Sequence, residues 1–214
     1  MGVLSLVALC VVLAGCASTK RVEPKGFTEQ DRRKVDAVLM PLVSASAICA
    51  GQMRCPIGLG VRQDRRIEIA VGPHAPNKFG LTITAGALRS LQPSELQAAL
   101  AHELGHVQLG HLDSREARRQ AERAVGAAPN GDAVEALRRH RAYDREEEYA
   151  ADRYAVALLD RLPGGAGRGC PEVLLLLERL DLEELSPGWS HWLSTHPTPA
   201  ARLQALQAEC DKKP

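Results

Sequence analysis

Aromatic side chains are scarce in this chain of 214 residues, at 3% of the composition. Apolar residues still make up 45%, so a core can form from leucine, valine, isoleucine and alanine. A charge excess of either sign is also missing, because the formal net charge is +1. A nucleic-acid-binding domain usually carries a basic excess. The arginines of 115–123 alternate with glutamate, so we interpret this stretch as a solvated helix face rather than a nucleic-acid patch.

Internal repeats and CxxC motifs are missing as well. Without a period near 34 residues, the sequence does not favour a helical-repeat solenoid. Without CxxC, a cysteine-based zinc knuckle is excluded. The length suits one globular domain with a tail.

The chain begins with an apolar run of 16 residues, shorter than the roughly 20 that a membrane-spanning helix needs. The run fits the apolar region of a secretory signal, and its end at 13–16 resembles a bacterial lipobox, in which Cys16 is lipidated. No lysine or arginine precedes the run, so an uncleaved anchor or a buried helix is the alternative. We predict a signal peptide at 1–15 and a tether at 16–27. Ala17 after the cysteine resembles an outer-membrane sorting signal, at the periplasmic face.

Cys10 and Cys16 belong to the apolar run, and export would place the other four cysteines in an oxidising compartment, where an even number indicates disulfides. Four cysteines allow three pairings. We favour Cys49–Cys55 with Cys170–Cys210, because the first two are close in sequence and the second two flank one C-terminal unit.

The hydrophobic pattern predicts a mainly helical α+β domain with a small β-sheet. Alternating β-branched runs predict strands at 65–71 and 79–86, joined by a turn into a hairpin-like unit. Thr28 and Thr198 are predicted N-caps, and Pro199 suits a first helical position. The predicted helices are 28–47, 93–110, 111–128, 132–162, 170–180 and 198–209.

The sequence His102-Glu103-Leu104-Gly105-His106 forms the pattern HExxH within the predicted helix 93–110. Four positions rotate a helix by about 400°, so the two imidazoles share one face and can bind a single Zn²⁺. Glu103 can accept the proton of a water whose pKa the metal lowers towards about 7. A buried helix with hydrogen-bonded core histidines is the alternative. That alternative is costly, because a charge on such an apolar face needs a partner.

A hydrolytic zinc site needs a third protein ligand and one open position. His111 is one step out of register with the pattern that places a histidine six residues after HExxH, so we interpret it as a helix-end residue. Glu148 is the better candidate. It shares a helix face with Asp152, which can accept the N–H of a ligand histidine. Glu146 and Glu147 are predicted to face solvent.

Three ordered motifs resemble those of the gluzincin metallopeptidases that include HtpX and the CAAX prenyl protease. They are HELGH at 102–106, EYAAD at 148–152, and STHPTP at 194–199 with Arg202 following. Upstream, PNKFGLTIT and AGALRSL also look like the family, so the resemblance covers roughly residues 65–205. The membrane-spanning helices of the integral members are missing, which implies a soluble domain on a lipid anchor.

The resemblance implies a zincin-like metallopeptidase domain at 28–214, with the small sheet beside the HExxH helix. It implies one Zn²⁺ bound by His102, His106 and Glu148, with Glu103 as general base. Asp152 would support a ligand histidine.

Two functions remain open at this point. The first is a zinc endopeptidase acting on unfolded or misassembled envelope proteins. The second is a zinc-stabilised binding or chaperone-like lipoprotein with little turnover. Glu103 favours the enzyme, because a structural zinc site needs no base.

His196 and Arg202 are further candidate catalytic residues. His196 could fill the open zinc position and suppress activity, or donate a hydrogen bond to the oxyanion; Arg202 could supply that hydrogen bond instead. The alternative for His196 is a surface histidine before a proline. The predicted strand at 79–84 could be a sheet edge that aligns an extended substrate.

Overall fold

The computed structural model describes residues 28–50, 55–75, 78–112, 123, 131–184 and 198–212. The predicted signal peptide and tether, Cys16 and His196 lie outside these residues, as does most of the charged stretch 113–130. Within the described ranges, no helix combines the length and apolarity that crossing a membrane requires.

The sheet has three strands, in the order β1-β3-β2: β1 (Ile57–Arg62), β2 (Ile69–Ala75) and β3 (Lys78–Thr84). The predicted antiparallel pairing is confirmed, because β2 pairs with β3 and places Val71 opposite Leu81. The predicted bounds of its first strand, 65–71, are wrong: β2 begins at Ile69 and continues through 72–75, where Gly72 and Pro73 had indicated the turn. Strand β1 was not predicted. It pairs parallel with β3, with Leu59 opposite Leu81. Leu81 and Ile83 are fully buried, so the central strand is also the strand most deeply set in the core.

The prediction that strand 79–84 lies at a sheet edge is wrong, because β1 and β2 flank it. Among the described residues, no strand pairs with the other side of β2, so β2 is an edge strand. Thr84 donates its N–H to the carbonyl of Glu68, and hydrogen-bonded pairs alternate along an antiparallel ladder. The backbone groups of Ile69 and Val71 consequently point away from β3. The backbone of Pro73 also points away from β3. Its missing N–H therefore removes no hydrogen bond between the two strands.

The helices agree with their predicted caps. Thr28 forms a capping box with Asp31, and Thr198 accepts a hydrogen bond from the N–H of Ala201. The predicted strand 79–86 ends two residues early, because Thr84 caps a short helix that the pattern did not reveal. The helices are α1 (Glu29–Ala45), α2 (Ala85–Ser90), α3 (Pro93–Gln108), α5 (Gly131–Asp160), α6 (Gly169–Glu184) and α8 (Pro199–Cys210).

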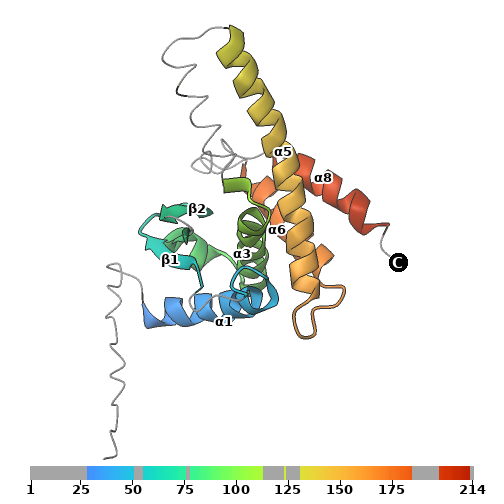
Figure 1. Cartoon of the computed structure of the whole chain (residues 1–214). Coiled ribbons are helices and arrows are strands. Elements are labelled where there is room, and N and C mark those ends of the chain that lie inside the picture. The colour runs from blue at the N-terminus through green and yellow to red at the C-terminus, as the bar shows by residue number, and fades with distance from the viewer. Residues whose placement is uncertain are drawn as a thin grey trace, which may run out of the picture.

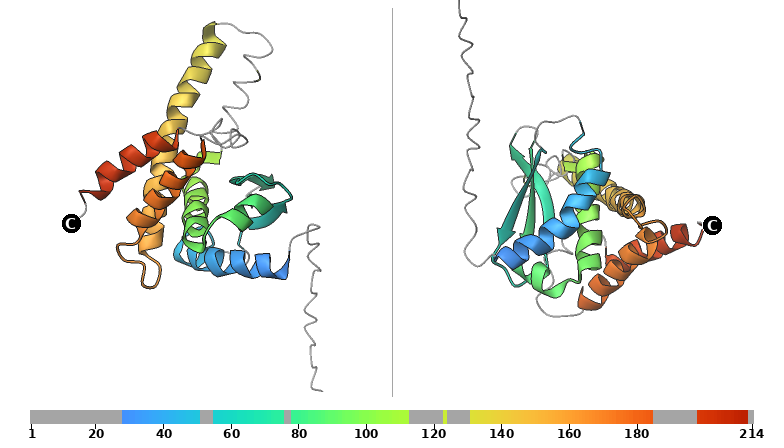
Figure 2. Two further views of the ribbon diagram at one scale, coloured as in Figure 1. Left: turned by 180° about the vertical axis from the view of Figure 1, so that it is seen from behind. Right: turned by 90° about the horizontal axis from the view of Figure 1, so that it is seen from below.

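Helix α3 runs through the middle of the molecule. In Figure 1 the sheet lies on one side of α3 and the helices α5, α6 and α8 lie on the other, and Figure 2 shows the same order from two further directions. Residues of α3 are therefore buried on nearly every side, including all of Leu100–His106. This position explains why the stretch 98–107 of the helix is apolar apart from His102, Glu103 and His106.

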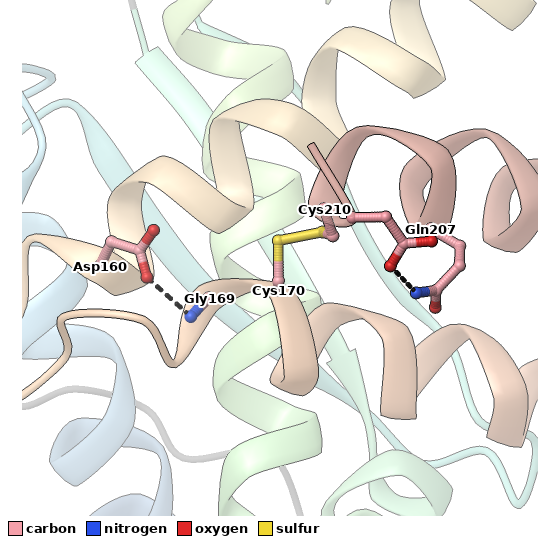
Figure 3. The surroundings of a disulfide bond; sticks show 6 residues. Asp160, Gly169, Cys170, Gln207 and Cys210 are labelled. Carbon is pink, nitrogen blue, oxygen red and sulfur yellow. Dashed lines mark hydrogen bonds between the residues drawn. A yellow bond between two sulfur atoms is a disulfide. The ribbon is translucent and has the colours of Figure 1, made fainter. Parts of the chain in front are cut away.

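Both favoured disulfides are present, Cys49–Cys55 and Cys170–Cys210. The second joins the start of α6 to the end of α8 across 40 residues of sequence (Figure 3). A loop of that length corresponds to roughly 4 kcal/mol of stabilisation in the chain-entropy treatment. Helix α8 is thereby fixed to the helical layer. Asp160 supports the same corner by accepting the N–H of Gly169.

Candidate active site

The predicted metal-binding residues converge from two helices. His102, Glu103 and His106 lie on α3, and Glu148 and Asp152 lie on the facing side of α5. Each of these five side chains is no more than 3% exposed. Helical spacing of four residues brings His102 and His106 onto one face, as the sequence predicted.

Close contact between the two helices sets the distance across the site. Gly105, inside HExxH, packs against Ala151, inside EYAAD. A Cβ at Gly105 would lie 3.2 Å from both the Cα and the carbonyl oxygen of Ala151, which is tighter than ordinary contact. A larger residue at 105 would therefore push α5 away. The small residues on both helices allow Glu148 to approach the two histidines.

The donor atoms of His102, His106 and Glu148 form a compact cluster. The Nε2 atoms of the histidines are 3.0 Å apart. The Glu148 oxygens lie 3.1 Å from Nε2 of His102 and 3.3 Å from Nε2 of His106. Tetrahedral zinc ligands at about 2.0–2.1 Å from the ion are roughly 3.3 Å from one another. Two imidazoles and one carboxylate at this spacing therefore fit one zinc ion.

A buried ion pair supports the first histidine. Nδ1 of His102 lies 2.9 Å from Oδ1 of Asp152. Arg202, from α8 and only 1% exposed, donates from Nε to the other oxygen of Asp152 at 2.9 Å and from Nη2 to Oδ1 at 2.5 Å. Nη1 of Arg202 also lies 3.5 Å from Glu148. Such a carboxylate fixes the tautomer of His102 with the proton on Nδ1, which leaves Nε2 to bind metal.

The pKa values follow from these contacts. Burial alone would raise the pKa of Asp152, but the charge and hydrogen bonds of Arg202 outweigh it and lower the pKa to about 2. Burial and Arg202 would lower the pKa of His102, but hydrogen bonds to Asp152 and Glu148 outweigh them and raise it to about 9. Asp152 is therefore ionised at neutral pH. A metal that binds His102 must displace a proton held more tightly than usual.

Glu103 points to the sheet side of α3. Its Oε2 accepts the backbone N–H of Val71 on β2 at 2.9 Å. This N–H belongs to the outward edge of the strand, so the hydrogen bond ties the HExxH helix to the free edge of β2. The sequence pattern gave no sign of it, because it joins a side chain to a backbone group 32 positions away.

The model of peptidase family M48 matches residues 70–210, which is more than half of the chain. The chain belongs to peptidase family M48. The matched segment contains β3, all of β2 except its first residue, and every residue of the His102, His106 and Glu148 cluster. The protein is therefore a zinc metallopeptidase, and the fold and ligand set that the sequence resemblance implied are confirmed. A search of curated proteins finds no match to this M48 peptidase.

The remaining predicted residues differ in where the structure places them. Arg202 reaches the site, but its guanidinium is engaged with Asp152, which favours a supporting role over contact with an oxyanion. Glu146 is exposed as predicted, whereas Glu147 is half-buried. His111 follows the end of α3 as predicted and is outside the metal-binding cluster, yet its ring contacts His106.

The contacts of Asp152 with His102 and Arg202 predict how much zinc affinity depends on this carboxylate. Asp152→Asn keeps a hydrogen-bond acceptor for His102 but leaves the buried charge of Arg202 without its main counter-ion. We expect zinc affinity to fall by about 10- to 100-fold, as is usual when a residue that orients a ligand is changed. Competition against a zinc chelator measures this. Asp160→Asn on the same helix is the matched control, because the amide can still accept the N–H of Gly169; an equal loss in both variants would contradict the assignment.

Proposed function

We propose that this M48 peptidase is an endopeptidase that cleaves unfolded or misassembled proteins in the bacterial cell envelope. The two disulfides support an oxidising compartment. Cys16 and Ala17 support a lipid anchor at the periplasmic face of the outer membrane. A labelled fatty acid should be incorporated into the wild-type protein and not into the Cys16→Ser variant. Wild-type protein that carries no label would rule out the lipid anchor.

The observation that carries the catalytic part of the proposal is the place of Glu103. Its buried carboxylate accepts the N–H of Val71 on β2, and Glu103 lines the same pocket as His102 of the zinc-binding cluster. Bound zinc supplies a Lewis acid and lowers the pKa of a water towards about 7. Glu103 then accepts the proton of the attacking water on its carboxylate and returns a proton to the leaving amine.

The free edge of β2 supplies a means of holding an extended chain. The outward N–H and C=O of Ile69 and the C=O of Val71 lie at this edge, whereas the N–H of Val71 is already donated to Glu103. A substrate strand pairing with β2 would be held through its backbone, so many sequences could bind. The strand proposed to bind substrate is therefore β2 and not the segment 79–84. Proline at Thr82 or Ile83 would break the central strand instead.

An apolar pocket adjoins the same edge and favours substrates with an exposed apolar side chain. His102, Glu103 and Arg202 form its polar end. The rest of its lining is aliphatic and comes from the segment 67–69, from the residue after α2, and from α3 and α6: Ile67, Ile69, Leu91, Ala99, Leu176 and Leu180. Unfolded proteins expose apolar side chains that folded proteins bury. The pocket and the strand edge together therefore select for unfolded chains.

The proposal is tested with one exported protein in two states. Zinc-loaded enzyme should cleave a destabilised, unfolded variant of that protein and leave its folded form intact at equal concentration. The N- and C-termini of the products should map to internal positions of the substrate sequence, as cleavage by an endopeptidase requires. If the enzyme instead binds the unfolded protein and prevents its aggregation without cleaving it, the chaperone-like alternative is correct.

If the substrate pairs with β2, only every second residue of the substrate should donate its backbone N–H to the enzyme. In a peptide substrate, N-methylation removes one backbone N–H at a time. Methylation at alternate residues should raise KM by roughly 2- to 12-fold each, since one hydrogen bond contributes about 0.5–1.5 kcal/mol. The residues between them should tolerate it, because their N–H groups face away from β2. A steady rise in KM at every position would contradict strand pairing.

A further inference from the structure

The end of α3 returns the chain towards the metal-binding cluster. At this end of the helix, the N–H of Leu109 donates to the carbonyl of Gly105 and the N–H of Gly110 donates to the carbonyl of Val107. Gly110 follows with φ 75°, a conformation that L side chains rarely adopt. No atom would lie within 4 Å of a Cβ at Gly110, so glycine is needed for its backbone and not for space. This turn brings His111 back beside His106.

The two rings meet through like atoms. Nδ1 of His106 and Nδ1 of His111 are 3.0 Å apart, and the ring planes are 67° from each other. One of these nitrogens must carry a proton and the other must accept it. Nε2 of His106 lies on the opposite side of its ring, beside Nε2 of His102 and Oε1 of Glu148.

A neutral imidazole that binds a metal through Nε2 carries its proton on Nδ1. Nδ1 of His106 is therefore the donor, and Nδ1 of His111 is the acceptor. The two zinc-binding histidines are thus supported by different groups. With Nε2 of each ring on the metal, Nδ1 of His102 donates to Asp152 and Nδ1 of His106 donates to the ring of His111, which the turn after the same helix supplies.

We propose that His111 is a positioning residue that holds His106 in the tautomer and ring orientation that zinc binding requires. The metal-binding motif therefore includes a third histidine, separated from the end of HExxH by four residues. Gly110 forms the turn that brings this histidine into contact with His106. The inference rests on the zinc site of the proposed peptidase and is independent of which proteins it cleaves.

The test measures zinc binding apart from activity. In a Glu103→Gln background, which avoids self-cleavage, the zinc dissociation constant is measured by chelator competition for His111→Ala, His111→Asn and Leu109→Ala. The thermal midpoint of each zinc-free variant is measured alongside. Asparagine can place its side-chain oxygen near the position of Nδ1. Leu109 is 44% exposed at the same helix end and serves as the control.

His111→Ala should weaken zinc binding by about 10-fold, within the range usual for residues that orient a ligand, without lowering the zinc-free midpoint. His111→Asn should recover most of the affinity, and Leu109→Ala should match the parent. Affinity of His111→Ala within twofold of the parent would overturn the proposal. So would a loss that asparagine does not restore and that a lower zinc-free midpoint accompanies. A wild type that binds zinc but cleaves no protein would refute the proposed function and leave this inference intact.

Discussion

Glu103→Gln should abolish peptide hydrolysis while zinc content stays near one ion per chain. Glutamine has the shape of glutamate, and its side-chain oxygen can still accept the N–H of Val71 that Glu103 accepts at 2.9 Å. It cannot accept a proton from water. General-base catalysis contributes about 10²- to 10⁴-fold, so kcat/KM on a fluorogenic peptide should fall by at least that range. Metal analysis of the same preparation measures the retained zinc.

Glu95→Gln is the matched control for this change. Glu95 is another buried glutamate of α3, 5% exposed, and it accepts the N–H of Gln92 at the start of the helix. Glutamine can keep that hydrogen bond, so this variant should retain activity. If a pure preparation of the Glu103→Gln variant still cleaves protein, Glu103 is not the general base. Loss of zinc together with activity would show that Glu103 holds the site together instead.

The helices could be predicted because their signals are local. Thr28, Thr198 and Pro199 mark helix starts within a few residues, and each was placed correctly. The end of α3 was harder. Its last helical residue is Gln108, two positions before the predicted end, because Gly110 adopts a positive φ.

The sheet was predicted only in part, because strand order depends on contacts between distant segments. Strand β1 contains Gly58 and Gly60, whose low strand propensity hides it in the sequence. Its pairing with β3 joins residues 22 positions apart, as in Ile57 with Phe79. No local pattern reports such pairing. Without β1, β3 was mistaken for an edge strand.

The metal-binding residues could be predicted because helical spacing defines them. His102 and His106 follow from HExxH, and Glu148 with Asp152 follows from a second pair four residues apart. The partners of these residues could not be derived in the same way. Arg202 approaches Asp152 only because α8 packs on α5, 50 positions further along the chain. His111 was dismissed because its spacing was judged for a ligand and not for a residue that orients one.

Glu148→Ala should remove both zinc binding and the stability that zinc confers. Among the side chains that the structure describes, the glutamate is the one metal ligand from α5, so its loss leaves the two histidines on α3. The fall in zinc affinity should exceed the 10- to 100-fold typical of residues that only orient a ligand. A ligand at 100 times its dissociation constant stabilises the native state by about 2.7 kcal/mol. Wild-type protein should therefore melt at a clearly higher temperature with zinc than with chelator.

The difference between the melting temperatures with and without zinc separates ligation from ordinary packing. Alanine at 148 also removes a buried carboxylate that lies 3.5 Å from Arg202, so the zinc-free variant itself should be less stable than zinc-free wild type. That loss appears in both conditions, whereas the zinc-dependent rise should vanish. Glu146→Ala, on an exposed position of the same helix, should keep the full rise. If Glu148→Ala kept it too, the third ligand would have to lie elsewhere, and the placement of α5 against α3 would lose its catalytic meaning.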